Sequence, residues 1–205
     1  IRIFNEYQKQ HIEPDIANIP CCAVLHLRDC VEVCQQANRH NMYGPSIALL
    51  RHCVETLTIV DVSLQEDSFS RPLLASWADG KKSHGELRKA LENQIWKRYG
   101  KGLWNEPWSD FFGNLARAVQ PYTHYTKELQ GWQLAMSDAH KPISKPDGGY
   151  MFICCLGIKV NDPLKASRIT LLISLIGWTL ARLLLMNTKD TEVRSFSNEI
   201  RDLGV

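Results

Sequence analysis

Apolar residues recur at intervals of three or four along most of the chain, which is the period of a helix with one buried face. The clearest example is residues 44–64. This segment opens with Gly-Pro-Ser, and proline fits the first turn of a helix because its missing N–H has no intrahelical partner there. The apolar positions that follow are Ile47, Leu50, Val54, Leu57 and Val60. We therefore expect a long, mostly buried helix around which the rest of the chain packs.

The same period predicts helices on both sides of this segment. Residues 21–40 follow it, and the short connection at 38–44 favours two antiparallel neighbours. Proline opens a long helix at 163–187, in which the run 169–186 is almost entirely apolar. Between them we expect a polar break at 65–71, a short helix or turn at 72–78 and a basic helical segment at 81–102. A further helix is expected at 111–119, capped by Ser109 and Asp110 and ended by Pro121. A helical pattern then resumes at 122–137.

These elements predict an all-α fold, an irregular bundle of about six or seven helices with 44–64 and 163–187 at its centre. Residues 140–149, with two prolines and two glycines, read as a loop, and 150–160 as either a short strand or the start of a helix. The polar residues 1–20 form a predicted N-terminal arm, and 21–205 a single helical-bundle domain.

The run 169–186 is also long enough to span a membrane, with Arg182 near one end and Lys165 and Arg168 near the other. We favour a buried core helix over a membrane anchor, because nothing else in the chain is typical of a membrane protein. The first twenty residues carry scattered charges and no apolar block, unlike a signal peptide.

Composition adds little about partners. The 24 Lys and Arg against 22 Asp and Glu give a net charge of +2, so only local clustering of charge can indicate nucleic acid. Seven cysteines, an odd number that includes two adjacent pairs, make a poor disulfide framework, and a reducing cytoplasm is the simpler expectation. His26, Cys30 and Cys34 share a helical face that can hold a metal, but buried structural cysteines are commoner, and we expect neither a metal nor a cofactor.

Two positions in the central helix are charged before Asp61. Arg51 and Glu55 lie four residues apart, share a face and can pair. The pair is either an ordinary surface ion pair or, because the helix is so apolar, part of a polar cleft.

The most basic segment is 81–102, whose buried side is predicted at Leu87, Leu91 and Ile95 with Trp96 and Tyr99 adjacent. Such a run is either a solvated helix face or a phosphate-contacting surface with aromatic residues beside it. The candidate RNA-binding residues are Lys81, Lys82, Arg88, Lys89, Lys97 and Arg98.

Candidate chemistry lies at Arg117 and His124. A histidine can take the proton of a ribose 2′-hydroxyl or protonate the leaving oxygen, while an arginine holds the phosphate and stabilises its developing charge. Tyr122 and Tyr125 flank the histidine and can stack on a base. The alternative is that this histidine is an ordinary packing residue.

The segment 117–124, RAVQPYTH, resembles the HEPN superfamily (higher eukaryotes and prokaryotes nucleotide-binding), helical bundles that carry Arg, four to six residues and then His. The stretch LLRHCVETL in the central helix resembles HEPN-like and abortive-infection-type bacterial proteins. The resemblance implies a metal-independent RNase or toxin in bacterial defence or stress, working as a homodimer with His124 and Arg117 as catalytic residues and Arg51 and Glu55 in support. This chain departs from the family in having Ala118 directly after the motif arginine and Pro121 inside the motif.

A rival interpretation needs no catalysis. A helical module can bind a protein partner or a small ligand in a cleft at Arg51 and Glu55. No phosphate-binding glycine loop, GxSxG or HExxH motif occurs in the chain, so other enzyme classes have no motif in their favour.

Overall fold

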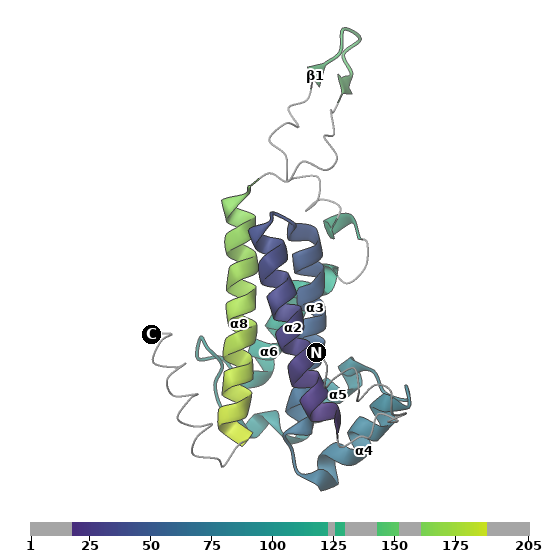
Figure 1. The fold of residues 1–205 in the computed structure, drawn as a ribbon, viewed down its shortest axis with the longest axis vertical. Helices are drawn as coiled ribbons and strands as arrows, with labels where there is room; N and C mark the ends of the chain where they lie inside the picture. Colours follow the sequence, from purple (N-terminus) through teal and green to yellow (C-terminus); the bar gives the residue numbers. More distant parts are fainter. Residues whose placement is uncertain (1–17, 123–125, 130–142, 152–160, 188–205) are drawn as a thin grey trace, which may run out of the picture.

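The computed structural model describes residues 18–122, 126–129, 143–151 and 161–187, and these form an all-α bundle with one small hairpin (Figure 1). The fold class predicted from the sequence is therefore confirmed. The helices are α2 (Ile19–Arg39), α3 (Tyr43–Ser63), α4 (Asp67–Ala78), α5 (His84–Gln94), α6 (Trp108–Val119) and α8 (Pro163–Asn187), with short 3-10 helices η2 (Trp96–Arg98) and η3 (Gln120–Tyr122). Strands β1 (Ile143–Ser144) and β2 (Tyr150–Met151) pair antiparallel.

Helix α3 is the centre of the bundle, as predicted. Figure 1 shows α2, α3 and α8 side by side along the long axis, with α4 and α5 towards one end of α3. The side chains of Leu50, Cys53 and Leu57 are fully buried. Because α3 is apolar on nearly every side, it can contact α2, α4, α5, α6 and α8.

Helices α2 and α3 form the predicted antiparallel pair. The turn between them passes through Asn41, whose φ of 58° is one that asparagine tolerates. Two reciprocal hydrogen bonds then join the helices: the Ser46 hydroxyl donates to the Cys34 carbonyl at 2.9 Å, and the Cys34 thiol donates to the Ser46 carbonyl at 3.4 Å. Ser46 thus satisfies its polar group inside the core instead of capping α3.

Helix α8 has the predicted bounds but not the predicted central position. Ile169, Ile176 and Leu183 are buried, whereas Leu164 and Leu171 are 62% and 57% exposed. Only 39% of its most apolar 18-residue window is buried, because α8 lies at the edge of the bundle and turns one face outward. The outward face also carries the exposed polar side chains of Ser167, Thr170 and Ser174, so it is mixed in character. By length and composition alone, α8 is the one helix among the described residues that is able to cross a membrane.

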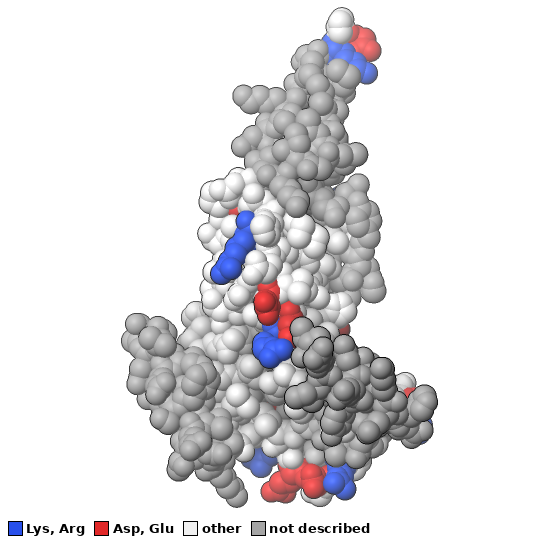
Figure 2. Space-filling view, in the orientation of Figure 1, with Lys and Arg blue, Asp and Glu red and all other residues white. Residues whose placement is uncertain are grey.

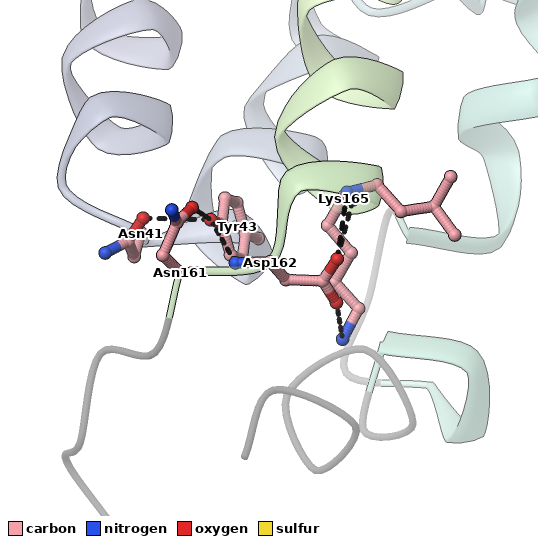
Figure 3. A network of polar contacts seen from close by, with 6 residues as sticks. Asn41, Tyr43, Asn161, Asp162 and Lys165 are labelled. Atoms are coloured by element: carbon pink, nitrogen blue, oxygen red, sulfur yellow. Dashed lines mark hydrogen bonds and ion pairs between the residues drawn. The ribbon is translucent and has the colours of Figure 1, made fainter. Parts of the chain in front are cut away.

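A polar network fixes the start of α8 against the α2–α3 turn (Figure 3). The Asp162 carboxylate accepts the backbone N–H groups of Leu164 and Lys165, both at 3.1 Å, and so caps the helix ahead of Pro163. These backbone hydrogen bonds, Lys165 first, lower the pKa of Asp162. The Asp162 N–H donates to the hydroxyl of buried Tyr43 at 2.9 Å, which joins the cap to the first residue of α3.

Replacing Asp162 with alanine is expected to lower the free energy of unfolding by about 1 kcal/mol, because the first turn of α8 loses its capping acceptor. Asp162→Asn keeps a capping oxygen and is the matched control, with a loss expected to be under half as large. Urea unfolding measures both variants. Equal stability of the alanine variant and the wild type would contradict the role of this cap.

Several predicted boundaries were wrong. Helix α4 begins at Asp67, inside the predicted polar break, because the Glu66 carbonyl accepts the N–H of Ser70 at 2.9 Å and Pro72 is tolerated within the helix. Helix α6 begins at Trp108 after Pro107, so Ser109 and Asp110 lie inside it and cap nothing.

The predicted loop 140–149 and the ambiguous segment 150–160 contribute the strands of the hairpin where they are described. Residues 1–17 of the predicted arm lie outside the described residues, and its last two positions belong to α2.

Candidate functional site

Arg117 lies on the exposed side of α6, two residues before the helix ends. Its Nη2 donates to Asn114 Oδ1 at 2.5 Å and its Nε to the Gly113 carbonyl at 3.4 Å, so the guanidinium is held along the helix surface. Helix α6 ends at Val119 and η3 follows through Pro121, as the proline predicts. The arginine of the motif is therefore accessible to a ligand.

Of the three candidate residues that follow Arg117, the structure describes Tyr122. His124 and Tyr125 lie outside the described residues, so their distance from Arg117 is not part of the structure. Tyr122 is partly buried and packs against the hydrophobic core, which leaves only part of its ring able to stack on a base. The predicted pairing of Arg117 with His124 stays a prediction.

The basic residues occupy three places instead of one helix face. Lys81 and Lys82 lie in the turn before α5, Arg88 and Lys89 within it, and Lys97 and Arg98 in η2. Lys81 is already paired with Asp79 at 2.7 Å. On the face shown in Figure 2, described lysines and arginines do not gather into a patch. The predicted buried side of this segment is confirmed at Leu87, Leu91 and Ile95.

The aromatic residues of the basic segment lie in the protein interior, which goes against the alternative of a phosphate-contacting surface with aromatic residues beside it. Trp96 and Tyr99 are 3% and 6% exposed, so neither is available to a nucleic acid. Both donate to the carboxylate of Asp61: Trp96 Nε1 to Oδ2 at 2.7 Å, and the Tyr99 hydroxyl to Oδ1 at 2.6 Å. They face inward because a buried carboxylate requires donors.

Asp61 is the best-buried charge among the described residues and the centre of a network between α3, η2 and α8. Burial raises its pKa to about 6, although the hydrogen bonds from Tyr99, Trp96 and Gln65 oppose this. The Tyr99 hydroxyl also accepts from Gln65 at 2.7 Å and from Asn187 at 2.8 Å. Burial and the neighbouring carboxylate raise the pKa of Tyr99. With Asp61 fully buried, the network is structural.

A small polar recess in the described surface surrounds the predicted Arg51–Glu55 pair, and the structure confirms that the two side chains are paired. Arg51 Nε and Nη2 lie 2.9 and 2.8 Å from Glu55 Oε1, and the side chains are 20% and 23% exposed, between a surface pair and a buried one. From α5, His84 and Arg88 form the opposite wall of the recess, whose volume is about 40 Å³. Val54, Thr58 and Gly85 complete the lining.

His84 was not predicted to belong to a site. Its ring is half-buried and meets Trp77 edge-on, with ring centroids 5.6 Å apart. Burial is the main cause that lowers its pKa, with smaller contributions from Arg51 and His52, while Glu55 opposes them. His84 is therefore mostly neutral at pH 7. The capping box of Ser83 and Glu86 starts α5 at this residue, and that sequence signal would have placed His84 and Arg88 on one helical face.

The candidate metal ligands on α2 do not converge. The ring of His26 lies 3.4 Å from the Cys30 thiol, whereas Cys34 bonds to the Ser46 carbonyl on α3. No group of three His, Cys, Asp or Glu side chains within the described ranges is placed to hold a metal ion.

Comparison of the chain with models of known families, with curated proteins and with solved structures found no match. The all-α architecture therefore rests on the structure alone. The resemblance to HEPN proteins rests on the residues that carry it, Arg117, His124 and the apolar helix with Arg51 and Glu55.

Proposed function

We propose that the protein is a HEPN-like RNase or toxin of bacterial defence or stress, which cleaves RNA in the cytoplasm without a metal ion. The observation that supports this most directly is the exposed guanidinium of Arg117 at the end of α6, seven positions before His124. An arginine in this position is free to contact a backbone phosphate. The all-α bundle is the fold that the resemblance implies.

In the proposed reaction His124 takes the proton of a ribose 2′-hydroxyl, and the freed oxygen attacks the adjacent phosphorus. The bond to the 5′-oxygen breaks, and the imidazolium form of His124 gives its proton to that leaving oxygen. Arg117 stabilises the negative charge that develops on the phosphate. From the resemblance, we propose that two copies of the chain face each other and that each contributes its Arg117 and His124.

A second candidate function is a non-catalytic helical module for a small ligand or a protein partner. The recess at Arg51, Glu55, His84 and Arg88 favours it, because four polar side chains from two helices meet there without burying one another completely. This candidate needs neither Arg117 nor His124.

The test is cleavage of end-labelled RNA in EDTA by the wild type, Arg117→Ala and His124→Ala. Loss of the phosphate contact or of the proton-transfer group is expected to slow cleavage by about 100-fold or more. Arg71→Ala is the matched control, since Arg71 is 71% exposed on α4 and forms only a long ion pair with Asp67. Its rate is expected to equal that of the wild type.

Equal cleavage by all four proteins would show a contaminating nuclease and remove both residues from the proposed site. No cleavage by the wild type, with mRNA and tRNA both offered, would contradict the RNase proposal and favour the binding module.

A further inference from the structure

The recess between α3 and α5 brings together more positive than negative charge. Each helix contributes two ionisable side chains four residues apart, Arg51 and Glu55 from α3, and His84 and Arg88 from α5. Two guanidinium groups stand against one carboxylate, which leaves the recess with a net positive charge even while His84 is neutral. A positive, partly desolvated recess favours an anion, because electrostatic attraction is stronger away from bulk water.

The two arginines retain unused donors. Arg51 directs Nε and Nη2 at a single oxygen of Glu55, and a guanidinium carries five N–H donors in all. Within the part of the chain that the structure describes, no ion pair engages Arg88, although its side chain is only partly exposed. An anion in the recess can thus be bound from both walls without breaking the Arg51–Glu55 pair.

The size of the recess limits the ligand. A water molecule needs about 10–15 Å³ of such space, so about 40 Å³ suits a group as large as a few waters and excludes a nucleobase. Val54, Thr58 and Gly85 provide no further charge. The recess also lies at the first turn of α5, where the helix dipole is positive. A single tetrahedral oxyanion fits both the size and the charge.

We propose that this recess binds one phosphate group, held between the guanidinium groups of Arg51 and Arg88 with the ring of His84 as a third contact. The ligand is either free inorganic phosphate or the terminal phosphate of a nucleotide or RNA chain. The site is independent of Arg117 and His124, so it goes beyond the proposed RNase activity and does not depend on it.

Binding of an anion is expected to raise the pKa of His84, because the anion favours the imidazolium form. Glu55, Arg51 and His52 of α3 already act on the charge of His84, and the ring of Trp77 on α4 contacts it. Arg88, on the same helix as His84, lines the same recess. Sulfate keeps its charge between pH 6 and 8 and therefore isolates this effect. Sulfate binding should be tighter at pH 6 than at pH 8, and this difference should vanish in His84→Asn.

The direct test is an NMR titration of the whole chain with sodium phosphate at pH 7, following the imidazole signal of His84 assigned by its loss in His84→Asn. We expect a saturable shift, with affinity at least tenfold weaker in Arg88→Gln. Arg71→Gln is the matched control: it removes the same guanidinium charge from α4, where the side chain is 71% exposed, and should change affinity less than twofold. A 5′-phosphorylated RNA trinucleotide and its unphosphorylated counterpart distinguish a terminal phosphate from the free ion.

No saturable shift, or equal weakening in Arg88→Gln and Arg71→Gln, would overturn the proposal, the second outcome by showing a general charge effect. Thermal unfolding confirms that both variants are folded before they are compared. Because the readout is binding at His84, a failure of RNA cleavage would leave this result unaffected, and the reverse also holds.

Discussion

Replacing Asp61 with alanine is expected to lower the free energy of unfolding by about 3 kcal/mol. The indole N–H of Trp96 and the hydroxyl of Tyr99 both lose their acceptor inside the protein. Each buried donor left without a partner costs about 1–3 kcal/mol. The loss is partly offset, since burial of the Asp61 carboxylate is itself unfavourable. Urea unfolding at pH 7 measures the change.

Asp29→Ala is the matched control for this measurement. Asp29 forms an ion pair with neighbouring Arg28, and both side chains are more than half exposed. Its removal is expected to change stability by less than about 0.5 kcal/mol. A loss below about 1 kcal/mol for Asp61→Ala would mean that water or a shifted side chain satisfies the two donors, and that the network is not a main support of the fold.

The same carboxylate is expected to make the protein more stable as the pH falls from 8 to 5. Its folded-state pKa of about 6 lies above the value near 3.9 of an unfolded aspartate, so the folded state binds more protons between these limits. The contribution is therefore fully present below pH 4 and is lost as the pH rises through 6. It amounts to about 3 kcal/mol in all, of which roughly half is gained between pH 8 and pH 5.

The measurement compares the pH dependence of the free energy of unfolding in the wild type and in Asp61→Asn. Other titrating groups, such as His84, contribute equally to both proteins, so their contributions cancel in the difference. The wild type should gain about 1 kcal/mol relative to the variant between pH 8 and pH 5. Parallel curves for the two proteins would show that the pKa of Asp61 is not raised by burial.

Periodicity alone was enough to predict the helical fold and its central element. The apolar residues of α3 and the proline at the start of α8 placed both helices within a residue or two of their observed ends. Periodicity could not show that α8 lies at the edge, because Leu171 on the exposed face is as apolar as Ile173 on the buried face. Which side of an apolar helix is covered depends on its neighbours, and the chain pattern does not encode them locally.

For the polar sites as well, local spacing predicts contacts within one helix but not contacts between helices. The Arg51–Glu55 pair follows from a spacing of four on one helix, and the sequence was sufficient to predict it. Its meeting with His84 depends on how α5 packs against α3, which no local pattern contains. The hydrogen bonds of Trp96 and Tyr99 could not be predicted for the same reason, because their acceptor Asp61 is more than thirty positions away in the chain.

The network at Asp61 also holds the end of α8. Helix ends ordinarily fray, since their final carbonyl groups lack partners. Here the side chain of Asn187, the last residue of α8, donates to the Tyr99 hydroxyl, and Tyr99 in turn is bonded to α3. The final turn of α8 can therefore open only together with the contacts of Tyr99. Its amide protons should exchange with solvent in one cooperative event with those of η2, and not by gradual unwinding from the end of the helix.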